Sequence, residues 1–221
     1  MHIAGIQKYP SAPQADAAII AALRDIPVAL LSDNLQRSCG SVGLNAYHRP
    51  APRAGTAVTV RTRSGDNLAI LRAFEYCRSG DVMVVDAGGD TSNAVVGGIL
   101  SFYAASIGLS GMIIDGAIRD IAEISDRNFP VYARGVNHRG PYKDGPGAIN
   151  VPISVGGMVV RPGDLVVGDR DGVVAFSPEI AISLIEKASV QRAKEEATMQ
   201  AMREGRWDRS FIDALEARCS N

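Results

Sequence analysis

The chain has 221 residues, which is enough for one or two domains with a full hydrophobic core. Its 23 Lys and Arg and 24 Asp and Glu give a formal net charge of −1, so we expect no nucleic-acid partner, because duplex binders normally carry a basic face. Three Cys and three His are too few and too dispersed for a disulfide scaffold or a Cys/His zinc site. A metal, if one is used, must be held mainly by oxygen ligands.

The sequence contains no apolar run approaching the 18 residues of a membrane-spanning helix. Residues 1–13 lack the basic start and the apolar run of a secretory signal. We therefore expect a cytoplasmic protein with no membrane partner.

Strand and helix patterns alternate through the first two thirds of the chain. In chain order we predict helices at 15–25 and 27–37, a strand at 56–63, a helix at 68–78, a strand at 82–85, a helix at 92–107, a strand at 112–114, a helix at 118–127, a strand at 130–133, several short β-segments within 149–177, and a long helix from 178 to about 204. This alternation predicts an α/β fold with a parallel βαβ core, a β-rich second layer and a long C-terminal helix.

We find no linker and no internal repeat, and we predict one domain over residues 1–221. Its core spans about 23–187, and residues 178–221 form a C-terminal helix with a docking tail. The tail carries Trp207, Phe211, Ile212 and Leu215, so we expect it to pack on the body or on a neighbouring subunit.

The sharpest candidate for chemistry is Asp115-Gly116-Ala117-Ile118-Arg119-Asp120, which follows a buried strand and opens a predicted helix. Ligands of βα units gather beyond the carboxyl ends of the strands. A carboxylate beside a guanidinium there can hold a hard cation together with an anionic substrate. The structural alternative is that Asp120 caps the helix while Arg119 forms a surface ion pair.

Two further clusters surround glycines, 17 of which lie among the 93 residues from Gly80 to Gly172. Residues 86–91 (Asp-Ala-Gly-Gly-Asp-Thr) follow a strand and lead to Gly97-Gly98-Ile99-Leu100, whose backbone N–H groups suit an anion, although a simple turn explains them too. Residues 136–147 form a long loop whose His138, Arg139, Tyr142 and Lys143 could bind an anionic tail or donate protons. A structural, hydrogen-bonding role for His138 is the alternative.

Taken together, four segments resemble one family. They are Asp81-Val-Met-Val-Val-Asp86, Gly111-Met-Ile-Ile-Asp-Gly-Ala-Ile-Arg-Asp120, Phe129-Pro-Val-Tyr-Ala133 and Pro162-Gly-Asp-Leu-Val-Val-Gly-Asp-Arg-Asp-Gly-Val173. They look like the RraA-like family, which includes the 4-hydroxy-4-methyl-2-oxoglutarate aldolases with oxaloacetate decarboxylase activity. The resemblance runs from about Leu23 to Lys187. It implies a compact α/β fold similar to the phosphohistidine swivelling domain, and homotrimers or homohexamers with sites between subunits.

The resemblance also implies residue roles. Arg119 matches the arginine that binds the pyruvyl group in the family's aldolases, and Asp120 matches the residue that holds a divalent metal, commonly Mg²⁺, largely through waters; Mn²⁺ is a possible substitute. The stretch Gly97-Gly98-Ile99-Leu100 matches the one whose N–H groups bind the pyruvyl carboxylate. The implied activity is that of a metal-dependent (class II) pyruvate aldolase or oxaloacetate decarboxylase, which cleaves a C–C bond of a short 2-oxo acid through a pyruvate enolate.

One departure concerns Gly98, because the aldolases carry an acid at this position that helps to move the proton. Aldol cleavage removes a proton from the substrate hydroxyl and needs a base, whereas decarboxylation chiefly needs the electron sink. We therefore hypothesise that the pyruvyl site is kept, and that aldolase activity is altered or supported by another acid. Asp90, Asp86 and Asp66 are the candidates.

A second interpretation is a non-catalytic protein, like the family members that bind and regulate a ribonuclease. Those lack the intact Arg-Asp pair that this chain has at 119–120. A methyltransferase label used for related sequences finds no support, because no segment resembles a methyl-donor site. Another enzyme using the same metal and enolate chemistry is a third possibility, with residues 138–143 selecting a different substrate.

Overall fold

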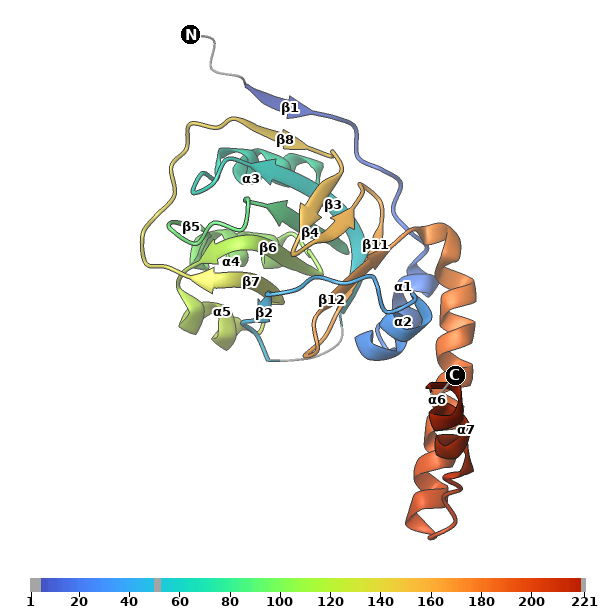
Figure 1. The fold of residues 1–221 in the computed structure, drawn as a ribbon. Helices are drawn as coiled ribbons and strands as arrows, with labels where there is room; N and C mark the ends of the chain where they lie inside the picture. Colours follow the sequence, from blue (N-terminus) through green and yellow to red (C-terminus); the bar gives the residue numbers. More distant parts are fainter. Residues whose placement is uncertain (1–4, 50–52, 220–221) are drawn as a thin grey trace.

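The computed structural model of the chain describes residues 5–49 and 53–219 (Figure 1). The strands are β1 (Ile6–Lys8), β2 (Asn45–Ala46), β3 (Arg53–Thr62), β4 (Asp81–Asp86), β5 (Ala94–Val96), β6 (Gly111–Ile118), β7 (Val131–Val136), β8 (Gly147–Ile149), β9 (Ile153–Val155), β10 (Met158–Val160), β11 (Leu165–Gly168) and β12 (Val173–Phe176). The helices are α1 (Ala17–Leu23), α2 (Val28–Asn34), α3 (Leu68–Ala73), α4 (Gly98–Ser106), α5 (Ile121–Arg127), α6 (Ala181–Arg203) and α7 (Ser210–Cys219), with 3-10 turns η1 (Phe74–Tyr76) and η2 (Pro178–Ile180).

The main sheet is mixed, in the order β1-β8-β3-β4-β6-β7-β2. Strands β3, β4, β6 and β7 are parallel neighbours, while β11 pairs antiparallel with both β3 and β12. A separate antiparallel hairpin joins β9 to β10. This topology confirms the α/β class with a parallel core, a β-rich second layer and a long C-terminal helix.

The parallel strands are apolar along their whole length because both faces of the sheet are covered. On one face, Met112 and Ile114 of β6 pack with α3, α4 and α5. On the other face, Ile113 and Tyr132 pack against the β9–β10 hairpin. A further cluster unites α1, α2 and α6 with β11 and β12. The sheet thus lies between two layers, and only its strand ends and connecting loops are free to form a site.

Two helix predictions are wrong at their N-terminal ends. The helix predicted over 92–107 begins only at Gly98, because residues 94–96 form strand β5. The helix predicted from 118 begins at Ile121, because β6 continues to Ile118. The longer β6 offers backbone partners to the β-branched pair Val95 and Val96, and pairing overrides the helical pattern. The short strands β1 and β2 were not predicted.

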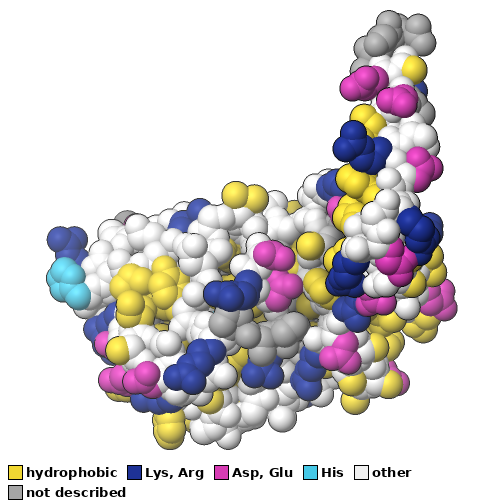
Figure 2. Space-filling model, turned by 90° about the horizontal axis from the view of Figure 1, so that it is seen from below, with side chains coloured by type: hydrophobic (Ala, Val, Ile, Leu, Met, Phe, Trp, Pro, Cys, Tyr) yellow, Lys and Arg dark blue, Asp and Glu magenta, His cyan; other side chains and the backbone are white. Residues whose placement is uncertain are grey.

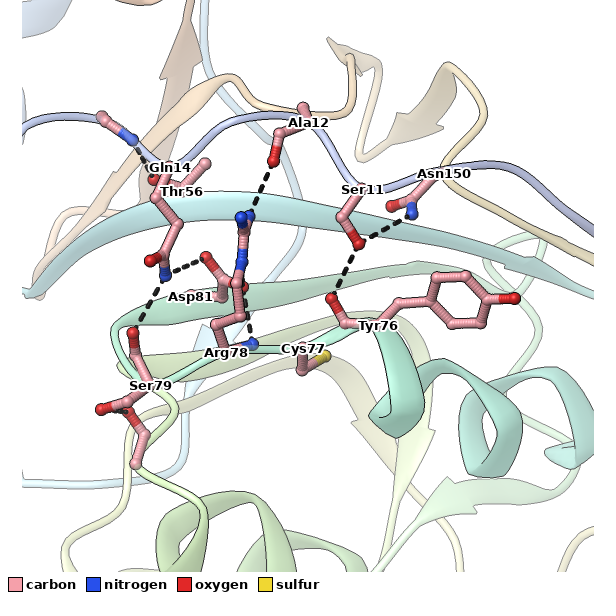
Figure 3. A network of polar contacts seen from close by, with 12 residues as sticks. Ser11, Ala12, Gln14, Thr56, Tyr76, Cys77, Arg78, Ser79, Asp81 and Asn150 are labelled. Carbon is pink, nitrogen blue, oxygen red and sulfur yellow. Dashed lines mark hydrogen bonds and ion pairs between the residues drawn. The ribbon is translucent and has the colours of Figure 1, made fainter.

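The N-terminal segment is tied along the sheet by polar contacts (Figure 3). The Gln14 amide donates to Asp81 Oδ1 (2.8 Å) and to the Ser79 carbonyl (2.9 Å). The Arg78 guanidinium donates to the Ala12 carbonyl (2.7 Å). Because Asp81 is fully buried, these bonds fix the segment that leads from β1 to α1.

The C-terminal helices form an arm that projects from the body (Figure 1), and Figure 2 shows apolar, basic and acidic side chains mixed along it. The chain reverses at Gly205, and Figure 1 shows α7 along the arm and away from the sheet. Contact of this tail with a neighbouring subunit stays a prediction. Within residues 5–49 and 53–219, no helix has both the length and the apolar content needed to cross a membrane.

His48 is buried beneath β7 and contacts the Tyr132 ring edge-on, with ring centroids 5.0 Å apart. Its Nδ1 lies 3.2 Å from the Val131 nitrogen and 3.3 Å from the Val131 carbonyl oxygen, so it bonds to the main chain of β7. Burial lowers the pKa of His48 below its ordinary value. The folded state therefore favours the neutral ring.

We expect the free energy of unfolding to fall as the pH drops from 7 towards 5, because the unfolded chain binds a proton at His48 before the folded chain does. The contribution of one such group is at most about 1.4 kcal/mol per pH unit. Urea unfolding at several pH values measures this slope. His48→Gln should flatten it, and an equal slope in the variant would contradict this assignment.

Candidate functional site

A pocket of about 200 Å³ opens where β5 and β6 end. The β5–α4 turn contributes Gly97, Ile99 and Leu100, and the end of β6 contributes Arg119 and Asp120. The loop after β7 closes one side with Pro141 and Lys143. The fold therefore brings together candidate site residues from two separate segments of the sequence, 97–100 and 119–120. The size suits a small organic acid rather than a dinucleotide or a peptide.

The close approach of two backbones shapes this pocket. The Arg119 N–H donates to the Val96 carbonyl (3.0 Å), which extends the pairing of β5 with β6. A Cβ on Gly97 would lie 2.6 Å from Asp120 Oδ2 and 2.9 Å from Arg119 Cγ. Only glycine leaves room for the Arg-Asp pair at this turn.

Asp120 has a left-handed backbone (φ 59°), which is unusual for a residue other than glycine and often marks a functional site. Its Oδ2 accepts the Gly98 N–H (2.9 Å) and lies 3.6 Å from Arg119 Nε. The two side chains are 40% and 41% exposed. A carboxylate and a guanidinium thus stand together at the mouth of the pocket, held by the start of α4.

The first turn of α4 offers hydrogen-bond donors to the same pocket. The Ser101 N–H returns to the Gly97 carbonyl (3.1 Å), so helix geometry leaves the N–H groups of Gly98, Ile99 and Leu100 without acceptors inside the helix. Asp120 takes the first of them. The other two, with the positive end of the helix dipole, favour a bound anion.

Glu123 lies beside Gly98, just outside the residues that line the pocket, and it was not among the residues expected from the sequence. Its carboxylate lies where the Cβ of any larger residue at position 98 would be placed. It pairs with Arg127 (2.9 Å), whose guanidinium also donates to the Gly98 carbonyl (2.8 Å). The signal in the sequence was its spacing, because Glu123 follows Asp120 by three residues and therefore shares its side of α5.

Asp66, a candidate acid, has a different environment. It is fully buried and accepts the N–H groups of Leu68 (2.9 Å), Asp144 (2.7 Å) and Gly145 (3.0 Å). Arg63 adds an ion pair at 3.2 Å. The Asp66 carboxylate thus fastens the loop that carries Lys143 to the start of α3.

The remaining candidate residues lie outside the pocket lining. Asp86 accepts the Gly88 N–H (3.0 Å). Asp90 accepts the hydroxyl (2.7 Å) and the N–H (2.9 Å) of Ser92, and these bonds hold the pKa of Asp90 below its usual range. His138 is exposed on the loop after β7. An acid–base role for any of them stays a prediction.

The donor chemistry of the pocket fits a hard divalent cation. The carboxylates of Asp120 and Glu123 both lie beside Gly98. Among the residues that the structure describes, no group of three or more His, Cys, Asp or Glu could hold a metal ion. A cation bound here would therefore keep several waters, as Mg²⁺ commonly does.

The sheet and the pocket define an α/β protein with an Arg-Asp pair set against a helix N-terminus. The family model for the RraA-like proteins (Aldolase/RraA) matches residues 28–175. The chain belongs to this family, as its sequence motifs led us to expect.

Known proteins agree with this assignment. A Halalkalibacterium halodurans protein named "Putative 4-hydroxy-4-methyl-2-oxoglutarate aldolase" is 40% identical over 193 residues, which cover 86% of this chain and 90% of that protein. A crystal structure from Pseudomonas syringae matches 89% of this chain and 93% of its own, with TM-score 0.80 and 26% identity. Streptomyces coelicolor RraAS2, described as an unusual member of the RNase ES inhibitor RraA family, matches 85% of this chain and 98% of its own, with TM-score 0.79 and 26% identity. The aldolase name of the Halalkalibacterium halodurans relative supports a lyase activity for this family member.

Asp66→Ala should lower the free energy of unfolding by about 3–5 kcal/mol, because it leaves buried N–H groups and a cation without their acceptor. Urea unfolding at pH 7 measures the loss. Asp90→Ala is the matched control and should cost less than about 1 kcal/mol, since its bonds are exposed. Equal losses for both variants would show that Asp66 is not the anchor.

Proposed function

We propose that the protein is a divalent-metal-dependent lyase that cleaves a C–C bond of short 2-oxo acids through a pyruvate enolate, as an oxaloacetate decarboxylase, a 4-hydroxy-4-methyl-2-oxoglutarate aldolase or both. The observation that carries the proposal is the Arg119–Asp120 pair beside the start of α4 in one small pocket. The aldolase name of the Halalkalibacterium halodurans relative adds support.

The pocket supplies separate partners for the two ends of such a substrate. The N–H groups of Ile99 and Leu100 and the Arg119 guanidinium suit the carboxylate and the 2-oxo group of the pyruvyl part. Lys143 lines the same pocket and suits the second carboxylate of a dicarboxylic acid. The apolar side chains of Leu71 and Leu100 leave a wall for the carbon chain.

Both reactions break the bond between C3 and C4 and leave its electron pair on the pyruvyl fragment as an enolate. Arg119 stabilises the negative charge that grows on the enolate oxygen. A divalent cation held by Asp120, with Glu123 close by, would act as a Lewis acid on the 2-oxo group. The enolate then takes a proton at C3 and leaves as pyruvate.

Aldol cleavage has one further requirement, since the C4 hydroxyl must lose its proton as the C4 carbonyl forms. An acid at position 98 would stand next to this hydroxyl, and this chain has glycine there. Because the Glu123 carboxylate fills the space beside Gly98, we assign the base role to Glu123. The acid is supplied by α5 instead of α4.

Chelation should abolish pyruvate release from oxaloacetate, and Mg²⁺ or Mn²⁺ should restore it. Asp120→Asn should require more metal for half-maximal rate, and Arg119→Ala should lower kcat about 100-fold or more, because it removes a charge that acts on the developing enolate. Coupled pyruvate detection measures both. Glu75→Gln, an exposed acid outside the pocket lining, is the control and should behave as wild type. Full activity in EDTA would contradict the proposal.

The role of Glu123 can be separated from that of the metal site. Glu123→Ala should slow cleavage of 4-hydroxy-4-methyl-2-oxoglutarate about 100-fold, and slow oxaloacetate decarboxylation far less. Adding Gly98→Asp to Glu123→Ala should restore cleavage, because the smaller residue at 123 makes room for the new side chain. An unchanged ratio of the two activities in both variants would show that neither position provides the base.

The similarity to Streptomyces coelicolor RraAS2 favours a second candidate, a protein that binds and regulates a ribonuclease. Binding to a purified ribonuclease E-type enzyme, with no metal-dependent pyruvate release, would support it over the lyase. For assembly we propose a homotrimer or homohexamer. Ile99 (82% exposed) and Phe102 (58% exposed) form an apolar surface beside the pocket that a neighbouring subunit could cover.

A further inference from the structure

The loop after β7 lies directly against the guanidinium of Arg119. A Cβ built on Gly140 would stand 2.9 Å from Arg119 Nη1 and 3.8 Å from its Cζ. Because it has no side chain, Gly140 allows the loop backbone to lie close to the Arg119 guanidinium. Because the contact is with the far end of a flexible side chain, a larger residue at 140 would displace the guanidinium rather than the backbone.

The same stretch of loop is fastened to the segment that leads into β5. The Asn93 amide donates to the Gly140 carbonyl at 2.6 Å. One step away, the Ala94 N–H donates to the Arg139 carbonyl at 2.9 Å. These bonds join the Gly140 backbone to the start of β5, the strand whose Val96 carbonyl accepts the Arg119 N–H.

A second tether joins the same two segments without involving Gly140. The Asn137 amide donates to the Thr91 carbonyl at 2.9 Å, and its Oδ1 accepts the Arg139 N–H at 3.0 Å. Two asparagine side chains, Asn93 and Asn137, thus fasten this loop. Of the two, only Asn93 bonds to Gly140, the residue that lies against Arg119. This difference allows a local effect on the guanidinium to be distinguished from a general effect on the loop.

We propose that Gly140 and Asn93 are positioning residues for Arg119: Asn93 fixes the Gly140 backbone, and that bare backbone sets how far the guanidinium reaches into the pocket. The inference rests on the proposed lyase function, in which Arg119 meets the enolate oxygen. Displacement of a catalytic group by about 1 Å can cost about 100-fold in rate. In residues 138–141, the absence of a side chain at Gly140 therefore contributes to the position of Arg119, in addition to any contribution from the charged residues of the loop.

The test is a double-mutant cycle on oxaloacetate decarboxylation in MgCl₂, with kcat and KM measured separately. Gly140→Ala should lower kcat/KM about 10- to 100-fold, mostly in kcat, while the unfolding midpoint stays within about 2 °C. In the Arg119→Lys background the same substitution should change kcat/KM less than about twofold, because lysine has no Nη1 to displace. Pyruvate titration calorimetry gives a second readout, and Gly140→Ala should weaken binding only when Arg119 is present.

Asn93→Ala should lower kcat/KM about threefold to tenfold, and Asn137→Ala, the matched control, less than about twofold. Equal effects of Gly140→Ala in both backgrounds, or equal effects of Asn93→Ala and Asn137→Ala, would overturn the positioning role while leaving the lyase in place. A wild-type protein without metal-dependent decarboxylation would instead overturn the proposed function, and this inference with it.

Discussion

The pairing of β5 with the end of β6 is the constraint on which the site depends. It brings the turn at Gly97 so close to Arg119 and Asp120 that no side chain fits between them. Helix α4 begins directly after this turn, and the N–H of its first residue, Gly98, donates to Asp120. The start of α4 and the Arg119 guanidinium are thus held close together by main-chain pairing, which costs no side-chain freedom.

The sequence predicted the parts of this arrangement that are contiguous in the chain. Alternating strands and helices indicated the parallel core, and the runs at 97–100 and 115–120 identified the two halves of the pocket. Strand β5 escaped prediction because it pairs with the extended end of β6, which the local pattern does not show. Glu123 escaped because its relation to Gly98 depends on how α5 packs beside α4.

The acidic residues show why residue type alone does not assign a role. Asp66 binds three backbone N–H groups, one from Leu68 close by in the chain and two from the distant pair Asp144 and Gly145. Asp115, the first residue of the 115–120 motif, pairs with Arg134 (2.5 Å) and accepts the Gly156 N–H (2.7 Å), so it joins β6, β7 and the β9–β10 turn. Among the described residues that line the pocket, Asp120 is the acidic one, and the Glu123 carboxylate lies nearby, beside Gly98. The hydrogen-bond partners of each acid, which come from distant parts of the chain, determine whether its carboxylate is used up in structural contacts or left available at the pocket.

The short strand β1 runs parallel to β8 and ends the sheet on that side. Without it, the N–H and carbonyl groups of β8 would form an open edge, which is a common starting point for edge-to-edge aggregation. Strand β8 directly follows the loop that covers Arg119, and Asn150 beyond it donates to the Tyr9 carbonyl (3.0 Å). Residues 6–9 thus cover the edge of β8 and hold the strand that follows the loop beside Arg119. One short segment therefore contributes both to solubility and to the placement of a strand next to the pocket.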